Sequence, residues 1–289
     1  MEFLETKEWI ARREAHAARV EPWVRPRVER MSRGERHPVE DFLFEYYPHR
    51  PGQLKRWHPG AGVVLLGEEA REFLEVPGYV EAGGGVMMGP LLEKRRAFVE
   101  WLGGFLEGID GRAGAFGCHG LHEWAMVYCS PEIRHGNWPL RLGFEGTAAV
   151  VESLPVRCSH YDAFRFFTPE ARPLNALQPT REATPHLEQS ACLHANMDLY
   201  KWAFKLSPWT PSEWVADAFE LARDIRVLDM RASPYDFSAL GYEAVKIETS
   251  EGRADYEKQQ RVFAERARPI RRRLVELCGE LLRYGITKF

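Results

Sequence analysis

The spacing of apolar residues in the last part of the chain places the strongest constraint on the fold. Between residues 252 and 283, apolar side chains recur at intervals of three, four or seven positions, at Tyr256, Phe263, Ala267, Ile270, Leu274, Leu277 and Leu281. This period fits the α-helix and predicts a long amphipathic helix with Pro269 as a kink. Because the apolar face of such a helix needs a partner, we expect a core built mainly of helices.

Start and stop signals mark the other elements. A first helix should begin at about Lys7, with Thr6 as its N-cap, and should be interrupted near Pro22 and Pro26. Further helices are predicted over residues 90–107, 192–206 and 210–230, a strand over 63–66, a flexible loop over 83–89 and an extended segment over 159–168. The predicted fold class is therefore mainly α, with a few short strands.

Length and composition are those of an ordinary globular protein, with 289 residues, of which 45% are hydrophobic and 28% charged. We expect a single compact, mostly helical domain over residues 1–289. Residues 1–89 should be an irregular N-terminal third, residues 118–235 should contain the functional site, and residues 252–283 should form the C-terminal helix.

Several function classes lose support. The net charge of −3 provides no long-range attraction to a polyanion. No stretch approaches the ~20 apolar residues of a membrane span, and the charged N-terminal segment is unlike a secretion signal, so we expect a cytoplasmic protein with no membrane partner. The five cysteines lack C-x-x-C spacing, which argues for reduced thiols. Serine-hydrolase, phosphate-loop and dinucleotide-binding motifs are absent.

The densest polar motif is Gly-Cys-His-Gly-Leu-His-Glu-Trp at residues 117–124, which brings His119, His122 and Glu123 within five positions. Its order differs from the H-E-x-x-H of zinc peptidases. Metal binding, acid–base or substrate-binding chemistry, and a purely structural polar cluster are all compatible with it. Trp124 and Tyr128 follow directly.

Two further helices carry ionisable groups next to apolar stripes. In the helix over 192–206, His194, Asp198 and Lys201 share one face, which is typical of a pocket edge but also of an exposed Asp–Lys pair. Asp229 continues an apolar stripe, so it should be at least partly buried and should need a partner such as Arg226 or Arg231. The alternative role for Asp229 is to anchor the turn that follows.

The segment over 159–168 places His160 and Asp162 on one side and Arg165 on the other. His-x-Asp can supply two metal ligands or an oriented acid. His135 adds another imidazole from a predicted loop.

Segments spread over nearly the whole chain resemble a bacterial family, frequent in actinobacteria, whose members usually carry the name 3-methyladenine DNA glycosylase. They are RHPVEDFLF (36–44), LKRWHPGAG (54–62), GLHEWAMVY (120–128), DAFRFFTP (162–169), residues 192–205 and LDMRASPY (228–235). The resemblance implies a cofactor-free, hydrolytic cleavage of the N-glycosidic bond of a modified nucleobase, in damaged DNA or in a nucleobase-containing small molecule.

The residues present permit that chemistry. Glu123, Asp198 or Asp229 could stabilise an oxocarbenium-like sugar or activate water, and His122 or His194 could assist departure of the base. The substrate contacts would come from Trp124, Tyr128, Tyr200, Lys201, Trp202, Arg165 and Arg231.

A second hypothesis is a metal-dependent hydrolase or oxygenase with one iron, manganese or zinc ion. Its ligands would come from His119, His122, Glu123, His160, Asp162 and His194, with His135 and Asp198 as further candidates. A third is a non-catalytic small-molecule-binding domain in which these groups are structural. Both catalytic hypotheses require the imidazoles and acids of the central segments to converge on one place.

Overall fold

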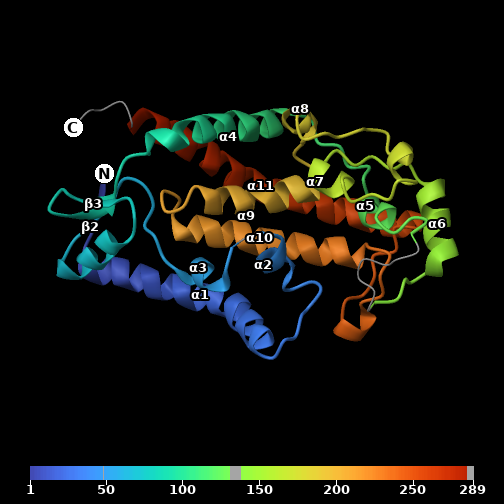
Figure 1. The fold of residues 1–289 in the computed structure, drawn as a ribbon, viewed down its shortest axis with the longest axis horizontal. Helices are drawn as coiled ribbons and strands as arrows, with labels where there is room; N and C mark the ends of the chain where they lie inside the picture. Colours follow the sequence, from blue (N-terminus) through green and yellow to red (C-terminus); the bar gives the residue numbers. More distant parts are fainter. Residues whose placement is uncertain (48, 131–137, 285–289) are drawn as a thin grey trace. The chain divides into compact units, whose positions relative to one another are not determined.

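The structure, a computed structural model, describes residues 1–47, 49–130 and 138–284 (Figure 1). The predicted mainly α class with short strands is confirmed, since most of the elements are helices and the strands are three or four residues long. No helix in these ranges combines the length and the apolar character that crossing a membrane requires.

The chain divides into two compact units. Unit 1 comprises Met1–Glu107, Leu199–Glu220 and Ile270–Phe289, and unit 2 comprises Gly108–Asp198 and Leu221–Pro269. Four helices contribute residues to both units: α4 (Glu93–Gly111), α9 (Leu193–Lys205), α10 (Ser212–Arg231) and α11 (Ser250–Tyr284). The bounds of α11 confirm the predicted terminal helix, while a single domain over the whole chain stays a prediction.

Unit 1 begins with β1 (Glu2–Leu4) and α1 (Thr6–Ser32), followed by α2 (Phe42–Tyr46) and α3 (Pro51–Lys55). The strands β2 (Val63–Leu65), β3 (Tyr79–Ala82) and β4 (Gly85–Met88) join β1 in one sheet of order β1-β2-β4-β3, and a 3₁₀ helix, η1 (Glu68–Glu75), connects β2 to β3. β1 pairs with β2 in parallel, and the other pairings are antiparallel. Next comes α4 (Glu93–Gly111).

The predicted interruption of the first helix is wrong, because α1 runs through Pro22 and Pro26. A proline inside a helix removes one backbone hydrogen bond and crowds the preceding turn. Burial of Trp9, Val20 and Val24 along one face offsets that cost. The helix also begins one residue earlier than expected, with Glu5 as the N-cap, whose backbone amide donates to the Glu8 carboxylate over 2.9 Å.

The predicted loop over 83–89 is instead the turn and second strand of the β3–β4 hairpin. Gly83 and Gly84 have φ values of +62° and +80°, which suits a two-residue hairpin turn. A Cβ atom on Gly85 would lie 2.2 Å from the Leu65 carbonyl oxygen, so only glycine lets β4 approach β2 this closely. Residues 1–89 are therefore more regular than predicted.

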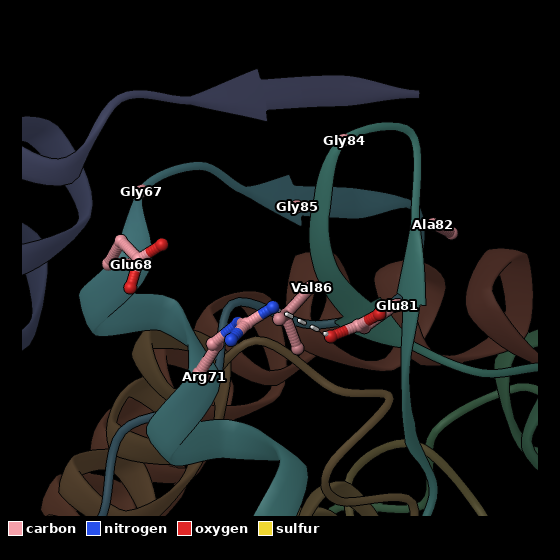
Figure 2. Close-up of a pocket in the computed structure, with 8 residues that line it drawn as sticks. All are labelled: Gly67, Glu68, Arg71, Glu81, Ala82, Gly84, Gly85 and Val86. Atoms are coloured by element: carbon pink, nitrogen blue, oxygen red, sulfur yellow. Dashed lines mark ion pairs between the residues drawn. The ribbon is translucent and has the colours of Figure 1, made fainter.

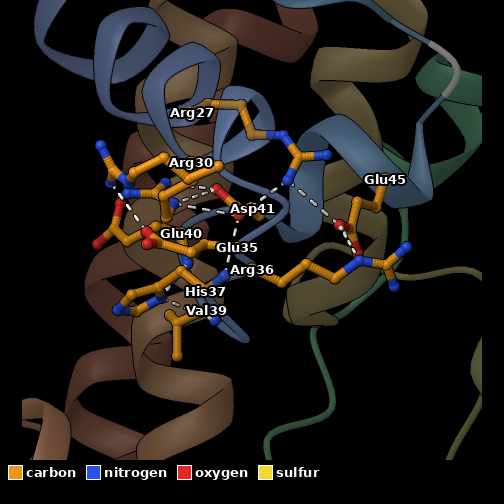
Figure 3. Close-up of polar contacts among 10 residues, drawn as sticks. Arg27, Arg30, Glu35, Arg36, His37, Val39, Glu40, Asp41 and Glu45 are labelled. Atoms are coloured by element: carbon orange, nitrogen blue, oxygen red, sulfur yellow. Dashed lines mark hydrogen bonds and ion pairs between the residues drawn. The ribbon is translucent and has the colours of Figure 1, made fainter.

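A buried carboxylate, that of Asp41, lies in one of the segments quoted for the family resemblance, residues 36–44. Asp41 has no exposed surface. It accepts hydrogen bonds from Arg27 (2.8 Å), from Arg30 and from the backbone amide of His37 (2.9 Å) (Figure 3). Burial alone would raise the pKa of Asp41, but these partners lower it below its ordinary value of 3.8. This cluster ties the loop after α1 to the end of that helix.

Unit 2 consists of short helices together with the parts of α4, α9, α10 and α11 that belong to it, residues 108–111, 193–198, 221–231 and 250–269. Its own helices are α5 (Leu121–Ala125), α6 (Gly143–Ser153), α7 (Tyr161–Phe164) and α8 (Thr184–Leu187), with 3₁₀ turns η2 (Arg172–Leu174) and η3 (Ser238–Leu240). The segment predicted as extended, 159–168, contains α7 instead. The alternation of polar and aromatic residues there follows a turn of helix, which periodicity over so few residues does not distinguish from a strand.

Candidate functional site

Three imidazoles from separate segments meet inside unit 2. His122 comes from α5, His160 precedes α7, and His194 lies in the first turn of α9. The ring of His194 lies between the other two, with its centroid 4.5 Å from that of His122 and 5.1 Å from that of His160. We call these three residues the histidine cluster. The predicted convergence of central imidazoles is therefore found.

Local backbone geometry places His122. Gly120, with φ +74°, allows the chain to turn into α5, and a side chain there would press on Tyr256 of α11. The helix is buried throughout, and Trp124 fixes it by donating its indole N–H to the Ala232 carbonyl over 2.8 Å. His119 has φ +46°, a strained value for a residue with a side chain.

Asp229 of α10 pairs with His122. Nε2 of His122 lies 2.9 Å from Oδ1 of Asp229, and both side chains are almost fully buried. Burial by itself would lower the pKa of His122, but the carboxylate outweighs it and raises the pKa well above 6.5. Burial would raise the pKa of Asp229, and the positive charges of His122 and Arg226 lower it instead. The two residues therefore form an ion pair of imidazolium and carboxylate, with one proton between Nε2 and Oδ1.

Arg226 extends this pair into a buried network. One guanidinium nitrogen, Nη1, donates to Oδ2 of Asp229 over 2.8 Å and to Oε1 of Glu123 over 3.2 Å. The prediction that Asp229 is buried and partnered is confirmed, with Arg226 as the partner. The other ring nitrogen of His122, Nδ1, lies 3.8 Å from Sγ of Cys118.

The second side of the histidine cluster is built around His160. Its Nδ1 lies 2.7 Å from Oε1 of Glu188, and since a carboxylate only accepts, Nδ1 must carry the proton. Glu188 is 1% exposed, and its other oxygen, Oε2, has no hydrogen-bond partner among the described residues. A buried carboxylate oxygen without a partner is uncommon and needs an explanation.

Three groups of side chains in this region hold their ligand-type atoms within 4.8 Å of one another, considering the described residues alone. They are His122 with His194 and Asp229, His160 with Glu188 and Cys192, and His160 with Asp162 and Asp198. Around an ion with bonds of about 2.1 Å, neighbouring ligand atoms lie roughly 3 to 4 Å apart, so these groups are close to coordination spacing. Burial, together with the positive charge of His122, lowers the pKa of His194 well below 6.5 and keeps its imidazole neutral.

The structure thus brings together most of the predicted acid, base and metal-ligand residues. His119 and Glu123 belong to none of the three groups. The ring of His119 packs edge-on against Tyr256, and Glu123 joins the network through Arg226. His135 lies outside the described residues.

Of the four aromatic residues predicted to hold a substrate, three are buried and one is half-buried. Trp124 has no exposed surface, and Tyr128 is half-buried, with its hydroxyl donating to Glu152 over 2.9 Å. Tyr200, Lys201 and Trp202 belong to unit 1. There Tyr200 is fully buried, and Trp202 packs against the ring of Trp101.

The two predicted arginines also have local partners. Arg165 pairs with Asp162 over 3.1 Å and stacks on Phe166. Arg231 donates to the Glu243 carbonyl over 2.8 Å. Trp124 and Tyr200 therefore present no ring face to a ligand, and Arg165 and Arg231 already have partners within the protein.

Sequence reasoning missed Glu188 and Cys192 as site residues, and also Cys118. Glu188 stands in a polar run after the short helix α8 (residues 184–187) and gives no periodic signal of burial. The spacing Cys192-x-His194 and the i, i+4 spacing of Glu188 and Cys192 were the available signals, and neither is specific.

A surface pocket in unit 1 has fewer groups suited to catalysis or metal binding than the histidine cluster has. The surface pocket in Figure 2, with a volume of about 580 Å³, is lined by glycine backbone and by Glu68, Arg71 and Glu81. Arg71 and Glu81 form an exposed ion pair at 3.6 Å across it. An exposed pair of this kind is an ordinary surface feature, so the histidine cluster is the better candidate.

No family model, no curated protein and no solved structure matches the chain. The resemblance to the glycosylase family therefore stays a prediction.

Proposed function

We propose that the protein is a metal-dependent enzyme whose ion is bound by His122, His194 and Asp229. Two imidazoles and one carboxylate leave coordination positions open for water, substrate or dioxygen, which is the arrangement of many catalytic rather than structural metal sites. The donor set suits iron, manganese or zinc. The ion would supply the Lewis-acid or redox chemistry of a hydrolase or an oxygenase.

The observation that carries this proposal is the meeting of these three donors, from α5, α9 and α10, within 4.8 Å of one another. Nε2 of His122 and Oδ1 of Asp229 are already 2.9 Å apart, with a proton between them. An ion bound by these two atoms would replace that proton. Arg226 would hold the second oxygen of Asp229, as outer partners of metal-binding carboxylates do.

A purely structural role, in which these residues form only an ion-pair network, explains fewer of them than a metal site does. It explains His122, Asp229 and Arg226, which hold α5 to α10. It gives no role to His194, whose ring lies against those of His122 and His160 and which lies within coordination spacing of the pair. A ligand role accounts for both its place and its neutral form.

Metal-free cleavage of an N-glycosidic bond fits the site less well. That chemistry needs a carboxylate that reaches the sugar. Asp229 has no exposed surface and accepts from both His122 and Arg226, while Glu123 is 6% exposed and accepts from Arg226. Nucleosides and alkylated DNA remain the substrates to test first, because the family resemblance implies them.

The first experiment is elemental analysis of protein purified without chelators, comparing wild type with His194→Gln. We expect a stoichiometric transition metal in wild type and a marked loss in the variant. His119→Gln is the matched control, since His119 is a neighbouring histidine outside the three groups, and it should keep the metal. Equal metal content in wild type and His194→Gln would contradict the proposal.

The same proteins should be assayed for release of free base from a nucleoside panel and from alkylated DNA. Release that requires the metal and His194 would identify the substrate class within the proposal. Release that is unaffected by chelator and by His194→Gln would instead favour the metal-free glycosylase.

A further inference from the structure

The side of the histidine cluster that contains His160 holds a buried carboxyl group with one oxygen that lacks a partner among the described residues. Glu188 is 1% exposed, yet only Oε1 has a partner, His160 Nδ1 at 2.7 Å. Oε2 has none among the described residues. Protonation does not remove the difficulty, because a buried O–H without an acceptor is as costly as a buried oxygen without a donor.

A soft donor lies beside this carboxylate. Sγ of Cys192, an imidazole nitrogen of His160 and a carboxylate oxygen of Glu188 lie within 4.8 Å of one another. Thiolate, imidazole and carboxylate are the three side-chain ligands that zinc uses. A cation at this point would give Oε2 its missing partner.

The loop that carries Glu188 and Cys192 is fixed in place. Arg112 donates to the Glu188 carbonyl over 2.7 Å and also to the carbonyl of Pro185. The side chain of Gln189 accepts from the amide of Ala115 over 3.0 Å, and Gln260 donates to the Ala191 carbonyl over 2.7 Å. These hydrogen bonds fix the backbone around Glu188 and Cys192, so the candidate ligand atoms of the two residues are preorganised, as a binding site requires.

We infer that unit 2 holds a second cation site, formed by His160, Glu188 and Cys192 and selective for zinc-like ions. His160 also has Asp162 and Asp198 within reach, and the unpartnered oxygen of Glu188 decides in favour of the group that contains Cys192. None of its ligands belongs to the site proposed at His122, His194 and Asp229, so the two proposals stand or fall separately. Binding releases the thiol proton of Cys192 to solvent.

Cobalt titration of metal-free protein tests this site directly. Co²⁺ bound by a thiolate gives an intense near-ultraviolet charge-transfer band that nitrogen and oxygen ligands do not give. We expect that band in wild type, its loss in Cys192→Ser, and its retention in Cys118→Ser. Zn²⁺ added afterwards should displace Co²⁺ and abolish the band. Absence of the band from wild type, or its survival in Cys192→Ser, would overturn the inference.

Zinc stoichiometry separates the two sites. Wild type should bind two equivalents, His194→Gln one and Glu188→Gln one. One equivalent that is lost in His194→Gln and kept in Glu188→Gln would leave the first proposal standing and refute the second site. One equivalent that is lost in Glu188→Gln and kept in His194→Gln would leave the second site standing and refute the first proposal. Circular dichroism of each variant should confirm that it is folded, and the cobalt band of wild type needs no variant at all.

Discussion

Nε2 of His122 and Oδ1 of Asp229 lie 2.9 Å apart, although 107 positions of sequence separate the two residues. The contact joins the short helix α5 to the long helix α10 inside unit 2. It also connects a chain of buried charge, since Arg226 bonds both Asp229 and Glu123. Most of the chemistry proposed here depends on this pair.

Removal of the Asp229 charge should strongly destabilise the protein. Asp229→Asn removes the carboxylate that neutralises His122 and one of the two carboxylates that Arg226 bonds, and breaking a buried pair in this way costs about 3–5 kcal/mol. Urea unfolding of metal-free protein measures this change. The control Asp255→Asn alters an exposed aspartate on α11 and should change stability by less than about 0.5 kcal/mol. Similar stabilities for the two variants would show that the network is not maintained in solution.

Acid should weaken unit 1 through Asp41. Its pKa is lowered on folding from the ordinary value of 3.8, so its ionised form stabilises the folded state. That contribution is complete above about pH 5, and it is lost as pH falls past 3.8 and through the folded-state pKa. Wild type should therefore lose more stability than Asp41→Asn between about pH 5 and pH 3, as measured by urea unfolding at each pH. Parallel curves for the two proteins would contradict the assignment.

Two glycine substitutions in unit 1 should act in opposite directions. Gly85→Ala places a methyl group 2.2 Å from the Leu65 carbonyl oxygen, so β4 must move from β2, at a cost of about 1–3 kcal/mol. Gly104→Ala, in α4, meets open space and should stabilise the helix by up to about 1 kcal/mol. Thermal unfolding should give a lower midpoint for the first variant and a higher one for the second. The same sign for both would argue against the strand pairing.

Cys118 should tune the metal without binding it. Sγ lies 3.8 Å from Nδ1 of His122, the ring nitrogen that is not bonded to Asp229. Loss of an outer partner of a metal-binding histidine typically costs 10–100-fold in affinity. Because this contact is long, we expect Cys118→Ala to weaken metal binding by about tenfold, measured by competition with a chelating dye. Complete loss of binding would make Cys118 itself a ligand.

The elements that sequence predicted best are those whose periodicity extends over many turns. The terminal helix and the burial of Asp229 follow from stripes of apolar residues that tertiary packing does not override. The β3–β4 hairpin was missed because its Gly83-Gly84 turn looks like a loop unless the flanking residues are known to pair. The helix through Pro22 was missed because its stability comes from burial against the rest of unit 1.

The site was predictable to the level of its histidines and less so for its acids. His122, His160 and His194 stand out because imidazoles beside apolar stripes are uncommon. Glu188 does not, since a glutamate in a polar run is usually exposed, and only the fold shows that the loop is buried. The aromatic residues misled in the other direction, because Trp124 and Tyr200 satisfy core packing with no ring face left for a ligand.

An anomalous-difference map would decide whether the metal site exists. The crystals should be grown from protein purified without chelators and measured at the absorption edge of the metal that elemental analysis identifies. We predict an anomalous peak about 2.0–2.2 Å from ring nitrogens of His122 and His194 and from a carboxylate oxygen of Asp229. A map without a peak between these residues, with the proton-sharing contact of His122 and Asp229 intact after soaking in zinc, manganese and iron salts, would contradict the proposed metal site.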